Sequence, residues 1–264
     1  MSGLRDLAGF TVRQGELGLR RSQLIVPRPD RVDAAVEDDI HHFRVTLHHD
    51  GAVVSRIEAG AVERWPWSTC PAAADHLAQR LTGASLEALA AVDPPQAHCT
   101  HMHELALLAA SHAGDGVPTL YTSFIADPVD GTQEAEVWVN GELALALTVR
   151  GSLIVAGGAL TGRDFRQYRQ WEGEVPTDQR RVVKVMRRVV QITGGRPFDY
   201  AATPSADYVV QSTGACFTFQ PERAATSLMT VEKREFSFGP PPLASLIAEV
   251  ADGVGSEGSA PGNV

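Results

Sequence analysis

The chain has 264 residues, a formal net charge of -9, 44% hydrophobic residues and three cysteines. This composition is that of an ordinary globular protein with one large or two modest domains, and it excludes a disordered chain. The acidic balance argues against nonspecific nucleic-acid binding, and no apolar run is long enough to cross a membrane. Because the first residues lack a basic-then-apolar leader and three cysteines build no disulfide framework, we expect a cytoplasmic location.

The first predicted segment, residues 1–39, is a polar, arginine-rich arm with one strand at most, at Leu24-Ile25-Val26. A hairpin is predicted next. Apolar residues alternate from His42 to Ala59 on both sides of Asp50-Gly51, and this pair of residues is typical of a tight turn between two strands.

Three helices are predicted after the hairpin. Apolar residues repeat at helical spacing after Cys70 until Gly83, where the pattern stops. A short second helix is predicted for residues 85–92, and a third for residues 100–114, directly after Cys99. Each of these two cysteines therefore stands at the start of a helix, with Cys70 as an N-cap.

Strands dominate the expected second half. The pair Asn140-Gly141 predicts a hairpin within residues 135–147, and residues 177–193 carry the pattern of the longest helix. Alternation in residues 208–219 and 232–238 predicts two more strands. After Leu246 the chain is rich in Gly, Ser and Pro, which is typical of disorder.

The predicted fold class is α+β with two domains. Residues 40–116 would form a metal-binding domain of antiparallel strands followed by helices. Residues 117–245 would form a strand-rich substrate or roof domain containing one long helix, and residues 246–264 a disordered tail.

All nine histidines and two of the three cysteines lie between His41 and His112. Thiolates and imidazoles are ligands for zinc and iron, and the dipole of a helix N-terminus favours the thiolate. Cys70 and Cys99 are therefore predicted metal ligands. Cys216, in a predicted strand far from any histidine in sequence, is interpreted as a structural thiol.

Two histidines are predicted to complete the site. His101 lies in the first turn of the helix that Cys99 opens, so both side chains can reach one ion. His42 is favoured as the fourth ligand because strand alternation places it opposite the apolar face of its strand. Other candidates for that position stay open: Asp39, His41 and His98.

These residues resemble a known family. The stretches Cys70-Pro71-Ala72-Ala73-Ala74 and Leu81-Thr82-Gly83-Ala84-Ser85-Leu86-Glu87-Ala88, followed by His98-Cys99, are similar to motifs of iron–sulfur cluster scaffold proteins of the IscU/NifU type. The resemblance covers residues 40–113 and implies an IscU-like domain. Where that family carries its first cysteine and aspartate, this chain reads Glu37-Asp38-Asp39-Ile40-His41-His42, so one thiolate is missing and a cluster is less expected than a single ion.

The whole chain also resembles an uncharacterised bacterial family with Cys-Thr-His-Leu and Cys-Tyr-x-Phe-Gln-Pro motifs. Here these read Cys99-Thr100-His101-Met102 and Cys216-Phe217-Thr218-Phe219-Gln220-Pro221. This resemblance implies no reaction.

The expected function is that of a metal-dependent hydrolase or lyase acting on a small organic molecule. One zinc or iron ion per chain would act as a Lewis acid or activate water, and Asp39 or Glu104 would move protons. The expected partner is the small-molecule substrate, without nucleic acid or membrane, and a homodimer stays open. The alternatives are a scaffold or carrier that delivers metal or a cluster to a partner, and a structural zinc site in a binding module.

Overall fold

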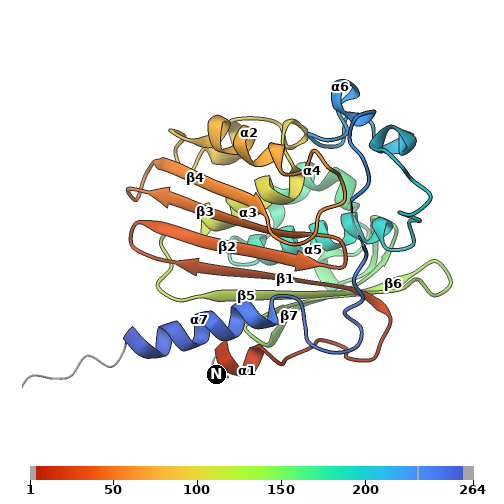
Figure 1. Ribbon diagram of the computed structural model, residues 1–264. Helices are drawn as coiled ribbons and strands as arrows, with labels where there is room; N and C mark the ends of the chain where they lie inside the picture. Colours follow the sequence, from red (N-terminus) through yellow and green to blue (C-terminus); the bar gives the residue numbers. More distant parts are fainter. Residues whose placement is uncertain (1–3, 231, 258–264) are drawn as a thin grey trace, which may run out of the picture. The chain divides into compact units, whose positions relative to one another are not determined.

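The computed structural model describes residues 4–230 and 232–257 (Figure 1). The fold is mixed α and β, with strands in the hydrogen-bonded order β4-β3-β2-β1-β5-β6-β7-β8. The chain divides into two compact units. Unit 1 takes in the chain up to Ser22, residues Leu120–Arg196 and the chain from Glu235, and unit 2 takes in Gln23–Thr119 and Pro197–Arg234. Strand β1 (Gly18–Pro27) contributes residues to both.

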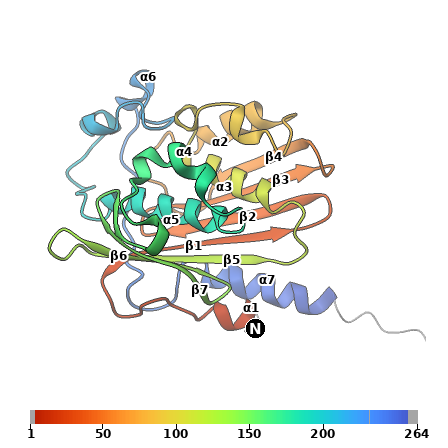
Figure 2. The same cartoon turned by 180° about the vertical axis from the view of Figure 1, so that it is seen from behind.

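Unit 2 is built on the antiparallel strands β2 (Arg31–Asp38), β3 (His42–His49) and β4 (Val54–Ala61). Helices α2 (Ala72–Leu81) and α3 (Thr100–Ser111) pack on one face of these strands (Figures 1 and 2). The predicted hairpin and these two helices are therefore confirmed. The predicted helix over 85–92 is wrong, because only the 3-10 turn Leu89–Ala91 forms there.

Strand alternation decides which side chains of unit 2 face the helices. Phe43, Val45 and Leu47 are fully buried, whereas Arg44 between them is exposed. Val36 pairs with Phe43, and the next pair along, Glu37 with His42, points to the other face of the strands. This register places an acid and an imidazole side by side, away from the helices.

The second part of unit 2 has no regular strand where two were predicted. Residues 208–219 hold the 3-10 turn Val210–Ser212, and Gly214 has a φ of 74°, which a strand does not accommodate. The described residues of 232–238 also form no strand. The short helix α6 (Pro221–Ala224) follows the first of these segments.

Unit 1 contains the antiparallel strands β5 (Thr119–Ala126), β6 (Gln133–Val139), β7 (Glu142–Arg150) and β8 (Leu153–Ala156). The helices of this unit are α1 (Leu4–Leu7), α4 (Tyr168–Trp171), α5 (Arg180–Ile192) and α7 (Ala244–Glu257). Helix α5 packs on β6 and β7, and α7 on α1 (Figure 2). The predicted hairpin at Asn140-Gly141 and the long helix are confirmed, with φ of 49° and 82° at the two turn residues.

The predicted arm and tail differ from the structure. Residues 1–39 contain α1, β1 and β2 instead of an irregular arm. Residues 246–257 belong to α7, in which Ile247 is buried and which packs on α1, so this part of the predicted tail is an ordered helix. The remainder of the predicted tail, 258–264, lies outside the described residues. Residues 197–234, predicted in the second domain, belong to unit 2 with the cysteine-rich segment.

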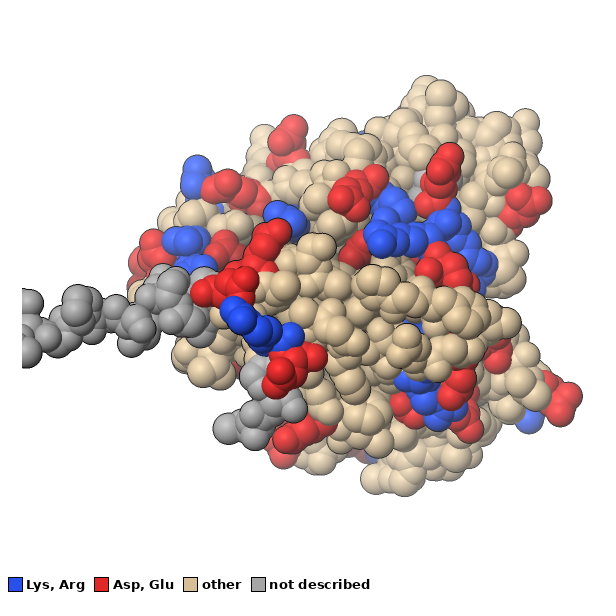
Figure 3. Space-filling view, turned by 60° about the horizontal axis from the view of Figure 1, so that its bottom comes forward, with Lys and Arg blue, Asp and Glu red and all other residues tan. Residues whose placement is uncertain are grey.

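The described surface mixes charges of both signs. On the face in Figure 3, Lys and Arg lie beside Asp and Glu around a tan area of uncharged residues. Among the described helices, none combines the length and the apolar character that crossing a membrane requires.

Candidate metal centre

Three segments that are far apart in sequence meet in unit 2. The backbone N of Phe217 donates to the carbonyl of His98 over 2.9 Å, which brings the neighbouring residues Cys216 and Cys99 together. The Sγ atom of Cys70 lies 3.8 Å from Oγ1 of Thr218. We call Cys70, Cys99 and Cys216 the thiol cluster.

The surroundings of the thiol cluster disfavour a negative charge on sulfur. Cys70 and Cys99 are buried and Cys216 is partly exposed, and none of the three forms a disulfide. Burial raises the pKa of Cys70 far above its usual value, and interaction with Cys99 and, more weakly, Cys216 raises this pKa further. The Cys70 thiol therefore stays protonated unless a bound cation displaces the proton, as a coordinating metal does.

Helix α3 adds a favourable dipole to this region. Cys99 is its N-cap, with φ of -60° and ψ of 111°, and its side chain makes no capping hydrogen bond. The sulfur lies beside a helix N-terminus, where negative charge is stabilised. Cys70 stands one residue before the N-cap of α2, which is Pro71 rather than Cys70 as predicted.

A stack of histidines lies next to Cys99. The rings of His98 and His103 are nearly parallel, with centroids 4.7 Å apart, and His76 lies 5.2 Å from His98. Oδ2 of Asp93 lies 3.3 Å from Nε2 of the fully buried His98, whose Nδ1 makes no hydrogen bond. Burial lowers the pKa of His98, which favours the neutral imidazole that a metal requires.

The Asp93 carboxylate beside His98 is held by Arg80. Two hydrogen bonds of 2.8 Å join the guanidinium to the two carboxylate oxygens. This pairing lowers the pKa of Asp93 to about 2, so the carboxylate stays ionised near the ring. A carboxylate next to a ligating histidine is the usual way to orient the ring.

The predicted ligand His101 packs elsewhere. Its ring stacks on His41 at 3.8 Å between centroids, close to Phe43. Nδ1 of His41 lies 2.9 Å from Oδ1 of Asp38, and this oxygen also accepts from the backbone N of Ile40 and of His41. His41 is thus fixed by Asp38 at the end of β2.

The predicted ligand His42 lies with two carboxylates. Its Nδ1 is 3.6 Å from Oε2 of Glu63 and 3.9 Å from Oε1 of Glu37. In the described part of the chain, these three residues form the group of potential ligands whose donor atoms all lie within 4.8 Å of one another. Burial is the main cause that lowers the pKa of His42, while Glu37 and Glu63 oppose the shift.

The two predicted proton-transfer residues lie on different elements: Asp39 follows β2, and Glu104 lies on α3, the helix that Cys99 precedes. Asp39 is buried at the end of β2, and its carbonyl accepts from the backbone N of Arg234 over 2.8 Å. Burial raises the pKa of Tyr200, and the charges of Asp38 and Asp39 raise it further, which places this phenol near the same acids. Glu104 is half-buried on α3.

The structure thus brings Cys70 and Cys99 into one region and adds Cys216, which sequence reasoning interpreted as structural. It places His101 beside His41, and His42 beside Glu37 and Glu63. Among the described residues, the predicted ligand His42 belongs to a group whose donor atoms all lie within 4.8 Å of one another, whereas Cys70, Cys99 and His101 do not, and the three sulfurs form no such group. The motif Cys216–Pro221 was the one feature of the sequence that drew attention to Cys216, and no feature drew attention to Glu63.

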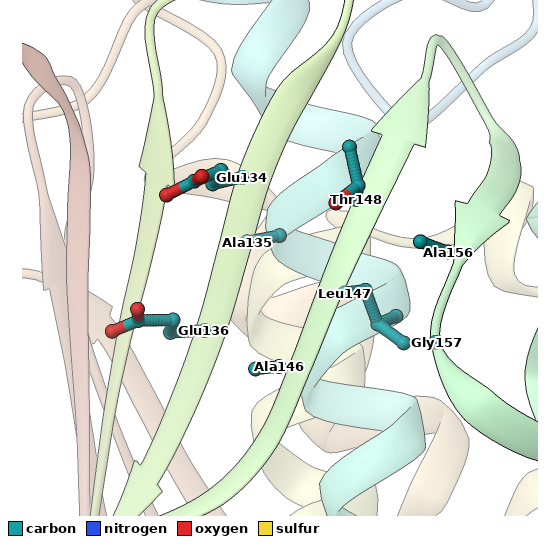
Figure 4. Close-up of a pocket in the computed structure, with 8 residues that line it drawn as sticks. All are labelled: Glu134, Ala135, Glu136, Ala146, Leu147, Thr148, Ala156 and Gly157. Atoms are coloured by element: carbon teal, nitrogen blue, oxygen red, sulfur yellow. The ribbon is translucent and has the colours of Figure 1, made fainter.

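Unit 1 has a separate hollow of about 300 Å³ on strands β6 and β7 (Figure 4). Its acidic side chains, Glu134 and Glu136, are held by Arg13 through contacts of 2.7 and 3.2 Å. The remaining lining residues are small or apolar apart from Thr148: Ala135, Ala146, Leu147, Ala156 and Gly157. The carboxylates of this hollow are already paired with Arg13.

Comparisons with known proteins assign no function to the chain. No protein-family model matches the chain, and no curated protein matches it at a significant level.

Proposed function

We propose that this protein is a metal-dependent enzyme of the hydrolase or lyase type, acting on a small organic molecule through one zinc or iron ion at the thiol cluster. The observation that carries the proposal is the meeting of Cys70, Cys99 and Cys216 from three distant segments. Two buried thiols and a partly exposed third, none in a disulfide, supply the sulfur donors that zinc and iron bind. His98 is the nitrogen donor closest in sequence to the cluster.

The same ligands define what the ion would do. Three thiolates would leave a fourth position for water or substrate, and the partial exposure of Cys216 gives that side access to solvent. Such an ion acts as a Lewis acid or lowers the pKa of its bound water. If His98 also binds, the site is closed and stabilises the fold instead.

Proton transfer at this site would fall to groups near the thiols. Glu104 lies on α3 next to His103, whose ring stacks on His98, so Glu104 is retained as a candidate. Asp39 lies near Arg234 and Tyr200, and it is the weaker candidate for chemistry at the thiol cluster.

A scaffold or carrier of the IscU type is the second candidate. Its support is the order of elements in unit 2, where antiparallel strands precede α2 and α3 and each helix follows a cysteine. A carrier must release its cargo, and burial of Cys70 and Cys99 slows that release. We therefore place the enzyme first.

Elemental analysis of protein purified without added metal tests the proposal. We expect about one zinc or iron ion per chain at the thiol cluster of the wild type and a clear loss of that ion in Cys99→Ser and Cys216→Ser, while the exposed-face control His48→Ala keeps it. Turnover on a panel of small esters, amides and hydroxy acids should follow metal content. Trace metal in the wild type contradicts the metal assignment, and rapid transfer of the ion to an acceptor apoprotein without turnover favours the carrier.

A further inference from the structure

We propose that Glu37, His42 and Glu63 form a second metal site, for a divalent ion of the zinc type, on the face of the β2–β3 pair that points away from α2 and α3. This site is independent of the thiol cluster. We call the three residues the carboxylate–imidazole site. The proposal rests on register, on donor distances and on the burial of an imidazole without a hydrogen bond.

The backbone holds the three donors on adjacent chain segments. Glu37 and His42 are cross-strand partners, so their side chains lie side by side. The carbonyl of His42 accepts from the backbone N of Val62 and its N donates to the carbonyl of Arg64, which fixes Glu63 between these two contacts. The site is thus set by strand pairing rather than by a loose loop.

The donor distances fit a shared ion better than direct hydrogen bonds. Nδ1 of His42 is 3.6 Å from Glu63 and 3.9 Å from Glu37, whereas a hydrogen bond to oxygen requires about 2.7–3.2 Å. Two donors bound at about 2.0–2.1 Å to one tetrahedral ion lie about 3.4 Å apart. Small side-chain movements would therefore bring all three donors into one coordination shell.

The His42 side chain gives a second, independent observation that points to a bound ion. It is only 9% exposed, and neither of its ring nitrogens makes a hydrogen bond. Burying such a group without a partner is costly. A bound cation at Nδ1 would remove that cost for one nitrogen and draw both carboxylates toward the ring.

Arginines around the site would orient the ligands instead of replacing the ion. Nη2 of Arg64 donates to Oε1 of Glu37 over 2.7 Å and to the carbonyl of Asp38 over 3.2 Å, and Nη1 of Arg234 lies 3.6 Å from the same Oε1. A carboxylate has two oxygens and about four acceptor positions, so Glu37 can accept from Arg64 and still bind an ion. Such hydrogen bonds to ligating carboxylates are the usual support of a metal site.

One side of the site stays open. The Glu63 side chain is 63% exposed, in contrast to the buried Glu37 and His42. Three protein donors with a solvent-facing fourth position are the arrangement of zinc ions that retain a water ligand. The ion would therefore be exchangeable from the Glu63 side.

Metal titration of the full-length protein tests this site. Chelator-treated wild type and variants are titrated with Zn²⁺ by calorimetry and with Co²⁺ by absorption spectroscopy. Co²⁺ bound by thiolates gives intense sulfur-to-metal bands, whereas Co²⁺ bound by nitrogen and oxygen gives weak bands only, so the two sites are counted separately. Glu63→Gln is the main variant because an exposed side chain can change without unfolding the protein, and His42→Ala is the second.

We expect Glu63→Gln and His42→Ala to lose one bound ion per chain and the weak bands, while any sulfur-to-metal bands stay unchanged. Since loss of an outer-shell partner costs 10–100-fold in affinity, loss of a direct ligand should cost at least about 100-fold. The matched control Glu58→Gln, on exposed β4 beside His48 and Arg56, should bind like the wild type. Equal stoichiometry and affinity in the wild type and Glu63→Gln would mean an ion-pair network only and overturn the proposal.

Discussion

A buried arginine organises the segment before β1, and its removal is the sharpest stability test in unit 1. Arg20 is 1% exposed. Its guanidinium lies 4.8 Å from the ring centre of Phe124. The acceptors of its N–H groups are the carbonyls of Val12 at 2.9 Å, of Glu16 at 3.0 Å and of Arg13, and Oγ of Ser237 at 2.9 Å.

The change Arg20→Met keeps the length of the side chain and removes every donor. An acceptor left buried without a partner costs about 1–3 kcal/mol, and two of these carbonyls, those of Glu16 and Arg13, are only partly buried and regain water. The two buried acceptors, the Val12 carbonyl and the Ser237 hydroxyl, therefore predict a loss of about 2–6 kcal/mol in the free energy of unfolding. Arg20→Lys keeps the charge but cannot present the planar fork, so its loss should be intermediate.

Urea denaturation followed by tryptophan fluorescence measures this loss, and thermal unfolding should shift by about 2–4 °C per kcal/mol. The matched control is Arg5→Met, because the Arg5 side chain is 73% exposed and pairs only at the surface with Asp252. That change should stay within about 0.5 kcal/mol. A loss below about 1 kcal/mol in Arg20→Met would refute the view that these carbonyls depend on the guanidinium.

Two further changes test packing and charge in unit 1. A Cβ at Gly18 would lie 2.5 Å from the carbonyl oxygen of Ile125, so Gly18→Ala should cost about 1–3 kcal/mol in thermal unfolding, while Gly60→Ala, with no atom in the way, should be close to neutral. The Arg166 guanidinium lowers the pKa of Asp164, so this acid stabilises the fold above its unfolded pKa of about 3.9 and loses that effect as the pH falls further. Asp164→Asn should therefore cost about 1 kcal/mol or less at pH 7, and the difference from wild type in urea unfolding should shrink below about pH 4; a difference independent of pH would contradict the charge explanation.

Local signals predicted the elements that depend on local chemistry. The turns at Asp50-Gly51 and Asn140-Gly141 have backbone angles that few residues adopt, and the helices after Cys70 and Cys99 have an apolar face at helical spacing. These elements form for reasons contained within about a dozen residues. The sequence therefore predicts them without knowledge of the rest of the chain.

Elements that depend on distant partners escaped prediction. The arginine-rich start of the chain is polar by composition, and only the carbonyl acceptors around Arg20 make burial of that charge acceptable. Conversely, residues 208–219 alternate like a strand, but they carry Gly214 in a left-handed conformation and form single turns. Alternation alone does not supply the neighbouring strand that a β-strand needs.

Histidines that are close in sequence lie in two separate environments in the structure. His41 and His42 are adjacent, and adjacent residues at the start of a strand point to opposite faces. His41 stacks on His101 of α3, whereas His42 meets Glu37 and Glu63 on the face away from the helices. Sequence distance could not separate these environments, because strand pairing and not the spacing of the histidines decides their neighbours.

The thiols behave in the opposite way. Cys216 lies 117 positions after Cys99 in the chain and still joins its region, because the backbone N of Phe217 donates to the carbonyl of His98. A metal site predicted from clustering alone therefore merges residues that the fold separates and omits Cys216, which the fold brings into the region of Cys99.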